Sequence, residues 1–282
     1  MHKIPDCTFT CTVPADSQRC LLHFEGADYR TTVWVNGQEV GKHEGGYCRF
    51  SADCTDYLRD GENVLTVRCE DSPDTCQPRG KQRWETYSFG CWYVQTTGLW
   101  KPVWGELVLA VRLDSVKITP DYDNECEKFG YTLSGQNENT EIGAEIRIRD
   151  RFVTRVRVGD DRAHITQTVD LRWNPFEWKI GGWAPWDPNL YDVTFTVYQN
   201  GEVTDTVGSH FGLRKIEADE KGIRLNNVPV YQKLVLAQNY WRESGLTAAG
   251  EDALIAKYDD MTSASCISPA SPPSGGRDCC GI

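Results

Sequence analysis

Residues 211–240 read FGLRKIEADEKGIRLNNVPVYQKLVLAQNY, and this stretch decides how the rest of the chain is interpreted. Upstream of it, the sequence consists almost entirely of short β-strand patterns. Within it, Asn226-Asn227 followed by Pro229 predicts a hairpin turn, and the apolar run 230–237 predicts a strand that opens a new domain. Only a few dozen residues follow this run. We therefore expect the chain to be the front part of a larger protein.

Length and charge exclude several classes of protein. The 282 residues suffice for two or three small domains. The net charge is −11 with acidic and basic residues interspersed, so we expect no nucleic-acid partner and no anionic membrane partner. No apolar run reaches the length of a membrane span, and the N-terminus has no signal-peptide pattern. A cytoplasmic location is expected on that ground.

The twelve cysteines are predicted to be free thiols, several of them buried in strands. Their separations do not follow a CxxC or paired zinc pattern, and the five histidines are scattered. We therefore expect no metal site.

The first domain is predicted to span residues 1–113 as an antiparallel sandwich of jelly-roll type. Leu22 and Phe24 alternate with His23, and the pair Asn36-Gly37 predicts a type I′ hairpin turn. The stretch 71–90 is polar, contains prolines and glycines and ends in aromatic residues. Such a stretch indicates a long loop, and loops of this length are usually functional.

A second sandwich is predicted for residues 114–217. About a hundred residues with roughly seven short alternating strands fit an immunoglobulin-like architecture. The segment 173–191 is rich in Trp and Pro and is expected to be rigid and irregular. Its tryptophans are predicted to pack at a domain interface: Trp173, Trp178, Trp183 and Trp186.

Residues 218–261 are expected to start a third domain. The stretch 247–257 predicts the first turns of a helix, with Thr247 as its N-cap. Residues 262–282 are dominated by Ser, Pro, Gly and Cys and have no periodicity, so no folded domain is expected there. This tail is interpreted either as disordered or as an aberrant end from out-of-frame translation or a truncated gene model.

Three groups of motifs resemble glycoside hydrolase family 2, the family of β-galactosidases, β-glucuronidases and β-mannosidases. TTVWVNGQEVGKHEGGYCRFSADCTDYL, ENVLTVRCED and TTGLWKPVW are similar to the family's N-terminal sugar-binding domain. WAPWDPNLYDVTFTV and HFGLRKIE resemble the end of its immunoglobulin-like domain, and GIRLNNVPVYQKLVLAQNYW resembles the start of its catalytic (β/α)₈ barrel. The resemblance implies an all-β chain: a jelly-roll-like sugar-binding sandwich, an immunoglobulin-like β-sandwich, and the truncated start of a (β/α)₈ barrel.

Members of this family are retaining glycosidases with one glutamic acid as acid/base and a second glutamate as nucleophile, about 5–5.5 Å apart. A barrel needs about 250 residues, and residues 221–282 supply far fewer. The family's Asn-Glu motif is not found in them. No residue is therefore assigned to catalysis, and the chain alone is expected to be inactive.

In the family, a loop of the first domain helps to shape the sugar pocket, and by position the loop 71–92 corresponds to it. A carboxylate, polar donors and flat rings in this loop suit the hydroxyls and C–H face of a sugar. The candidate substrate-binding residues are Asp71, Arg79, Lys81, Gln82, Trp84 and Trp92. No cofactor is expected, although the resemblance allows a cation beside the sugar. Core packing is predicted for Trp100 and Trp104, and residues 238–241 are expected to be exposed or disordered.

Three functions remain open from the sequence. The chain is the N-terminal part of a family 2 glycoside hydrolase that acts on β-linked glycans, a stand-alone carbohydrate-binding module, or a structural two-sandwich protein. The pattern after residue 221 favours the first, because a complete binding module would not need the start of a barrel. We also expect homo-oligomers, or association through the surface that faces the missing barrel.

Overall fold

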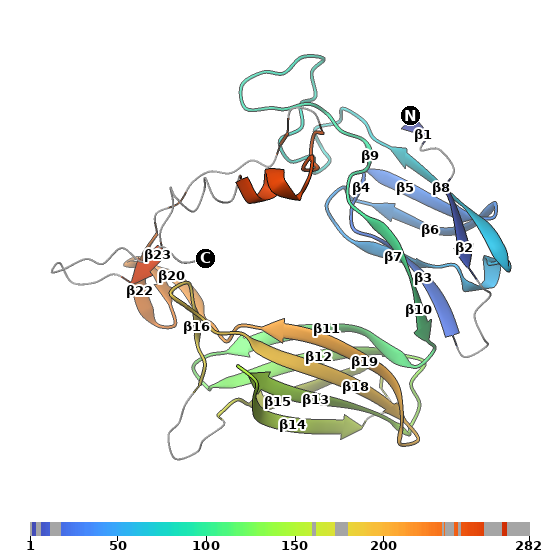
Figure 1. Cartoon of the computed structure of the whole chain (residues 1–282). Helices are drawn as coiled ribbons and strands as arrows, with labels where there is room; N and C mark the ends of the chain where they lie inside the picture. The colour runs from blue at the N-terminus through green and yellow to red at the C-terminus, as the bar shows by residue number, and fades with distance from the viewer. Residues whose placement is uncertain are drawn as a thin grey trace. The chain divides into compact units, whose positions relative to one another are not determined.

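A computed structural model of the chain describes residues 2–3, 7–11, 18–159, 162–172, 180–232, 234, 240–241, 244–256 and 267–269. The regular secondary structure of the described residues is almost entirely antiparallel β-strand, as the alternation predicts (Figure 1). The chain divides into two compact units. Unit 1 contains Met1–Leu109 and Ala237–Ala256, and unit 2 contains Ala110–Leu236 and Lys257–Ile282. No helix in the described ranges is long and apolar enough to cross a membrane.

Unit 1 contains the predicted jelly-roll-like sandwich. One sheet has the order β1-β8-β5-β6 with β2 also paired to β8, and the other has the order β10-β3-β7. A short pair, β4 with β9, accompanies them. The strands are β1 (His2–Lys3), β2 (Cys7–Cys11), β3 (Gln18–Phe24), β4 (Ala27–Asp28), β5 (Arg30–Val35), β6 (Gln38–Glu44), β7 (Phe50–Asp53), β8 (Gly61–Glu70), β9 (Gly98–Leu99) and β10 (Val103–Leu109), and one 3₁₀ turn, η1 (Thr55–Tyr57), follows β7.

The core of unit 1 forms from alternate residues of facing strands. Leu22 and Phe24 from β3 pack with Val33 from β5 and Val67 from β8. Because side chains alternate between the two faces of a strand, His23 points to the opposite face of its sheet. Three buried cysteines that form no disulfide complete this core, as expected for several cysteines: Cys20, Cys54 and Cys69.

The predicted hairpin turn between β5 and β6 is confirmed. Asn36 and Gly37 have φ angles of 51° and 83°, the left-handed values that a type I′ turn requires. The Asn36 side chain also donates to Asn63 Oδ1 at 2.8 Å and accepts from the Val64 backbone N–H at 3.0 Å. The turn therefore ties the β5–β6 hairpin to β8.

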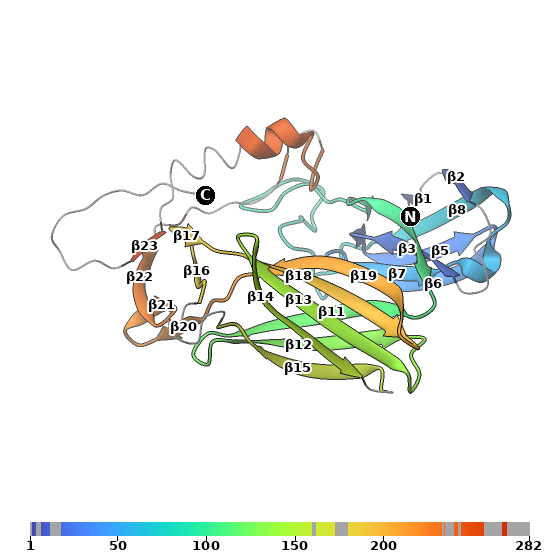
Figure 2. The same cartoon turned by 60° about the horizontal axis from the view of Figure 1, so that its bottom comes forward.

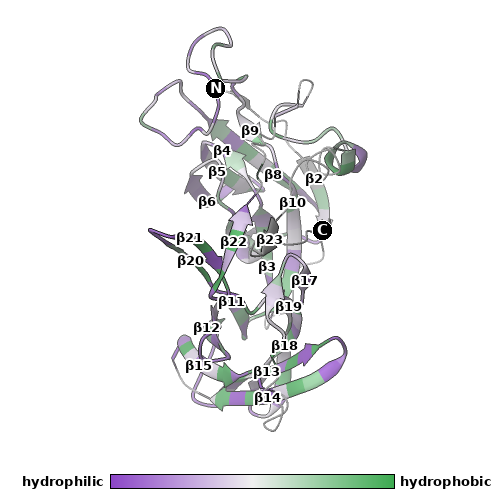
Figure 3. Ribbon diagram, turned by 90° about the vertical axis from the view of Figure 1, so that its left-hand side faces the viewer, coloured by the Kyte–Doolittle hydropathy of each residue, from purple (hydrophilic) through white to green (hydrophobic). Residues whose placement is uncertain are grey.

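Unit 2 contains the predicted immunoglobulin-like sandwich. A three-stranded sheet, β11-β12-β15, packs on a four-stranded sheet, β14-β13-β18-β19 (Figure 2). Hydrophobic and hydrophilic residues alternate along β13 and β14 (Figure 3). The strands are β11 (Arg112–Asp121), β12 (Cys126–Ser134), β13 (Thr140–Ile148), β14 (Arg151–Gly159), β15 (His164–Asp170), β18 (Tyr191–Gln199) and β19 (Glu202–Phe211).

The core of unit 2 includes a cluster of aromatic rings. Phe129 on β12 contacts Phe195 on β18 edge-to-face, with ring centroids 5.3 Å apart, and it also contacts Phe211 on β19. The irregular insert before β18 contributes a two-stranded pair, β16 (Trp183–Ala184) with β17 (Asp187–Pro188). Trp173 and Trp178 lie outside the described residues.

The stretch after β19 forms a small antiparallel sheet, β20 (Ile216–Asp219), β21 (Gly222–Leu225), β22 (Val228–Gln232) and β23 (Ile267–Pro269). The hairpin turn predicted at Asn226 and Asn227 is confirmed, because both residues have left-handed φ angles of 51° and 67°. The strands of a (β/α)₈ barrel are parallel, whereas the strands of this small sheet pair antiparallel. The assignment of 218–261 to the start of a barrel therefore stays a prediction. Of the strand predicted at 230–237, residues 230–232 belong to β22, and 233 and 235–237 lie outside the described residues. In the tail, 267–269 form β23 and the other residues lie outside the described ranges.

Candidate functional site

The predicted long loop is present in unit 1, where residues 71–97 connect β8 to β9. The loop folds back on itself through bridges between Gln82 and Tyr93 and between Phe89 and Trp92. Backbone hydrogen bonds hold this fold, among them Arg83 N–H to Tyr93 O at 2.8 Å and Tyr93 N–H to Lys81 O at 2.7 Å. The loop is therefore an organised structure, although it contains isolated bridges and no regular strand.

Arg79 acts as an internal clamp of the loop. Its side chain is buried, and its guanidinium donates to the backbone carbonyls of Ser72 and Asp74, both at 2.6 Å, and to the carbonyl of Arg83 at 3.2 Å. The Tyr47 hydroxyl donates to the Arg79 carbonyl at 2.9 Å. A Cβ atom at the next residue, Gly80, would lie 2.6 Å from that hydroxyl, and its φ is +60°. Glycine is required there.

Asp71 opens the loop, and its carboxylate is occupied by donors from the loop itself. Oδ1 accepts from the Ser72 N–H at 2.7 Å and from the Gln77 side-chain amide. Oδ2 accepts from the Gln95 amide at 3.1 Å and from the Thr97 hydroxyl at 3.3 Å. Asp71 thus ties the two ends of the loop together.

Gln82 joins the loop to the sandwich and is almost wholly buried, at 1% exposure. Its amide N–H donates to Asp28 Oδ2 at 2.7 Å, and its amide oxygen accepts from the Thr96 N–H at 2.7 Å. Burial raises the pKa of Asp28, and the hydrogen bond from Gln82 opposes this shift. The buried carboxyl and amide therefore depend on each other.

The aromatic residues of the loop pack together and leave part of their surface open. The Trp84 ring meets the Trp92 ring edge-on, with centroids 4.7 Å apart, and it meets Phe89 in the same way at 5.0 Å. Lys81 places its ammonium 5.1 Å from the centroid of Trp92 and 3.4 Å from Cys91 Sγ. Lys81, Trp84 and Trp92 are all half-buried, so part of the surface of each remains accessible.

Residues from the far end of the chain pack against this loop within unit 1. The Tyr240 ring stacks on Tyr93, with centroids 4.5 Å apart and an angle of 16° between the planes. Thr247 donates through its hydroxyl to the Trp100 carbonyl at 2.6 Å. Tyr240 and Trp241 are half-buried, so the prediction that they are exposed is wrong. The predicted residues Gln238 and Asn239 lie outside the described ranges.

The helix predicted near the end of the chain is present at 251–256. Its N-cap is not Thr247, because the helix begins later and the Thr247 hydroxyl is used by Trp100. The N-cap prediction is therefore wrong, and the reason is a tertiary contact that the local pattern does not contain.

Comparison with known proteins identifies the family of these two sandwiches. The family model described as glycosyl hydrolase 2 galactose-binding domain-like matches residues 6–112, and the model for glycosyl hydrolases family 2 matches residues 111–214. The chain belongs to glycoside hydrolase family 2.

Two curated relatives and one solved structure show how far the similarity of this family 2 chain extends. A candidate β-glucuronidase from Formosa agariphila is 28% identical over 71% of this chain and 23% of its own length. A β-galactosidase large subunit from Latilactobacillus sakei is 26% identical over 86% of this chain and 37% of its own length. A β-glucuronidase structure from Ruminococcus gnavus, in complex with an N1-substituted uronic isofagomine, has a TM-score of 0.69 at 16% identity and covers 90% of this chain and 44% of that one.

The family 2 chain thus spans less than two fifths of the length of either curated relative. The solved structure shares its fold, and at this identity the likeness extends no further.

The six residues predicted to bind sugar all lie in one organised loop of this family 2 chain, and their contacts differ. Arg79 and Gln82 are buried, and Asp71, Arg79 and Gln82 contact the loop itself and the sandwich beneath it. The other three are half-buried and have accessible surface: Lys81, Trp84 and Trp92. Direct sugar binding by any of the six stays a prediction. In the described residues, no group of three or more His, Cys, Asp or Glu side chains could hold a metal ion.

Sequence reasoning missed the residues on which the loop rests, namely Asp28, Tyr47 and Tyr240. Asp28 and Tyr47 lie far before the loop in the chain, and Tyr240 lies far after it. The only local signal was an acidic residue inside an apolar segment, GADY at 26–29, where a charge is costly unless it has a partner.

Proposed function

We propose that this chain is the substrate-recognition part of a β-glycosidase, with the loop 71–97 forming one wall of the site for a β-linked sugar. The observation that carries this proposal is the construction of the loop. Buried Arg79 and Gln82 and half-buried Asp71 fix its backbone, and a fixed backbone is what a binding wall requires to avoid an entropic cost when ligand binds.

The accessible groups of the loop suit a sugar. A flat indole covers the apolar C–H face of a pyranose, and an ammonium donates to hydroxyls or to the carboxylate of a uronic acid. The Lys81 ammonium lies over the Trp92 ring, 5.1 Å from its centroid, so the loop brings these two groups together. The relatives named as β-galactosidase and β-glucuronidase support a β-linked galactoside or glucuronide as the substrate. The acid/base and nucleophile glutamates are proposed to lie in the part of the relatives that this chain does not span.

Two measurements test the proposal. Calorimetric titration with galactose, glucuronic acid and mannose oligomers should show a binding event at the loop that is lost in Trp92→Ala. The purified chain should not turn over nitrophenyl β-galactoside, β-glucuronide or β-mannoside. Turnover with saturable kinetics, or binding that persists unchanged in Trp92→Ala, would overturn the proposal.

The stand-alone binding module is the second candidate. The Tyr93–Tyr240 stack favours the substrate-recognition part of a β-glycosidase over a stand-alone module. The chain returns from unit 2 to unit 1, where Tyr240 supports the loop 71–97. A module that binds glycan by itself would keep its affinity after removal of residues 237–282. The enzyme part should lose affinity when this support is removed.

A further inference from the structure

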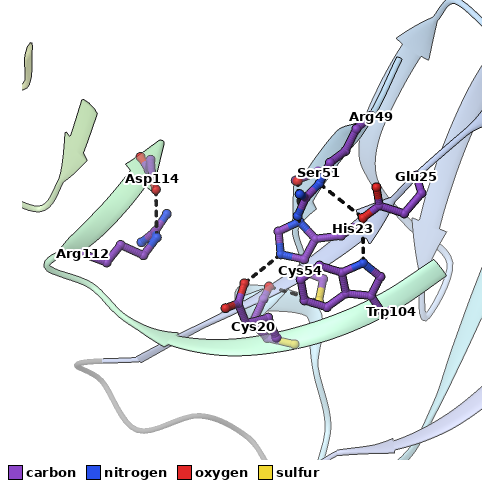
Figure 4. A network of polar contacts seen from close by, with 10 residues as sticks. Cys20, His23, Glu25, Arg49, Ser51, Cys54, Trp104, Arg112 and Asp114 are labelled. Carbon is purple, nitrogen blue, oxygen red and sulfur yellow. Dashed lines mark hydrogen bonds and ion pairs between the residues drawn. The ribbon is translucent and has the colours of Figure 1, made fainter. Parts of the chain in front are cut away.

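A second candidate binding surface lies on unit 1, on the outer face of the sheet β10-β3-β7. In the strand register Trp104 lies opposite His23, and His23 lies opposite Ser51. The Trp104 and His23 rings stack, with centroids 4.2 Å apart and an angle of 28° between the planes. This stack leaves His23 only 6% exposed, although it points away from the core (Figure 4).

Three neighbours fix the imidazole of His23. Ser51 Oγ lies 2.6 Å from Nδ1, and Glu106 Oε2 lies 3.0 Å from Nε2. A guanidinium nitrogen of Arg49 also lies 3.3 Å from Nδ1. Because a guanidinium can only donate, the Arg49 contact favours Nδ1 as an acceptor, with Nε2–H donating to Glu106. The ring beneath Trp104 is therefore held in one orientation.

Polar contacts also hold the Trp104 ring in place. Its indole N–H donates to Glu25 Oε1 at 2.9 Å, and Arg49 forms an ion pair with the same carboxylate at 3.4 Å (Figure 4). Arg49 also lies 5.4 Å from the indole centroid. Since its guanidinium reaches His23 as well, it must lie on the His23 side of the indole.

The stacking and cation contacts of Trp104 thus fall on one face of the indole, as far as the described residues go. The residue is 40% exposed, which is consistent with an opposite face turned to solvent. The sequence favoured core packing for Trp104, and that prediction is wrong. A large apolar ring held rigid at the surface is a common feature of binding sites.

Polar groups surround the open ring. Carboxylate oxygens of Glu25 and Glu106 retain lone pairs beyond the contacts above, and Ser51 is exposed.

We propose that this surface, the Trp104 platform (Glu25, Arg49, Ser51, Trp104 and Glu106), is a second carbohydrate-binding site. A β-linked pyranose stacks its C–H face on the open side of the indole, and the carboxylates of Glu25 and Glu106 accept hydrogen bonds from its hydroxyls. The site is built on strands of the sandwich and shares no residue with the loop 71–97. It therefore holds the chain on a polymeric glycan independently of the loop.

The order Ser51, His23, Glu106 also matches the residue types of an acyl-transfer triad. Arg49 argues against that chemistry, because its guanidinium donates to the same Nδ1 that would have to take the serine proton. The contacts of Ser51 and Glu106 with His23 instead support the platform, because they fix the ring on which Trp104 rests.

The test uses the full chain and two soluble probes, cellotetraose and β-1,4-galactotetraose. Calorimetry and the indole N–H signals of the ¹H–¹⁵N spectrum report on binding. We expect at least one probe to shift the Trp104 indole signal, which is assigned by its loss in Trp104→Phe. Trp104→Ala should weaken binding at this site about tenfold or more, in line with a stacking loss of about 1.4 kcal/mol.

The matched control is Trp186→Ala, because Trp186 has nearly the same exposure, 39%, and lies in unit 2. It should leave the affinity unchanged. Ser51→Ala and Glu25→Gln alter the rim and keep the indole, so they test the site even if Trp104→Ala folds poorly. Glu25→Gln should weaken binding severalfold.

Absence of any shift at the Trp104 indole with both probes would overturn the proposal. So would affinities in Glu25→Gln and Trp104→Ala that both equal the affinity of the unmodified chain. Loss of binding in Trp92→Ala with the Trp104 signal unaffected would support the loop site alone.

Discussion

The side-chain amide of Gln82 donates to the buried carboxylate of Asp28 at 2.7 Å, across 54 positions of sequence. Gln82 stands in the middle of the loop 71–97, and Asp28 ends strand β4. Gln82 and Asp28 are only 1% and 2% exposed, so each depends on the other as a hydrogen-bond partner. The loop is thereby attached to the sandwich at its centre as well as at its ends.

Replacing Gln82 by Leu should destabilise the attachment of the loop. The change leaves the Asp28 carboxylate and the Thr96 N–H without their partner, and an unsatisfied buried group costs about 1–3 kcal/mol. Hydrogen exchange of amides 93–97, followed by mass spectrometry, should accelerate by a factor of about ten or more. Gln38→Leu, at an exposed position of the β5–β6 hairpin, is the control. Unchanged exchange in Gln82→Leu would mean that the loop does not depend on this bond.

Tyr240→Ala should loosen two segments at once. It removes the ring that stacks on Tyr93 at 4.5 Å, and such pairs contribute about 0.5–1.5 kcal/mol beyond the area they bury. Faster exchange is expected both in loop residues around Tyr93 and in residues 244–247. Tyr231→Ala is a suitable control, because Tyr231 lies in unit 2 with most of its surface exposed. If only one segment responded, the stack would not couple them.

The hairpin turns, both sandwiches and the long loop could be predicted from the sequence because their signals are local. Asn36-Gly37 needs left-handed backbone, and strands with one buried face alternate with period two. The partners of the loop could not be predicted in this way. Nothing near Gln82 in the sequence indicates that its amide will meet Asp28, since that contact depends on how strands pack.

The tryptophans illustrate the same limit. Trp100 and Trp104 flank Pro102 and look equivalent in the sequence. Trp100 donates its indole N–H to the Gly46 carbonyl at 2.6 Å and is half-buried, whereas Trp104 lies on the outer face of β10. Pattern alone cannot separate the two, because the difference lies in which sheet face each ring meets.

Asn36→Ala should destabilise the β5–β6 hairpin and its junction with β8. Alanine loses the hydrogen bonds to Asn63 and Val64 and must adopt a φ of about 51°, which suits Asn better than Ala. We expect a loss of about 1–3 kcal/mol in the free energy of unfolding of unit 1, measured by urea denaturation. Asn36→Gly, which relieves the backbone strain, should recover part of the loss. Equal losses in both variants would place the whole effect in the side chain.

Glu127 should make the stability of unit 2 depend on pH. This residue lies on β12 with no exposed surface, and its Oε2 is buried without a hydrogen-bond partner. Burial raises the pKa of Glu127 from 4.5 to about 7, while backbone N–H groups oppose the shift and the nearby Asp121 charge adds to it. Below pH 4.5 the carboxyl is protonated in both folded and unfolded chains, so it has no effect on their balance.

Between pH 4.5 and 7 the unfolded chain releases this proton and the folded chain keeps it, so the free energy of unfolding falls as the pH rises. Above pH 7 the penalty is complete and amounts to about 3 kcal/mol, at about 1.4 kcal/mol per pKa unit. Glu127→Gln removes the titrating group and should therefore slow hydrogen exchange of β12 and β13 amides at pH 8, after correction for intrinsic rates. At pH 4.5 its effect should be small.

Glu138→Gln changes the same charge at an exposed position of unit 2 and should show no such pH dependence. Parallel pH profiles for Glu127→Gln and the unmodified chain would show that the buried carboxyl is not the titrating group.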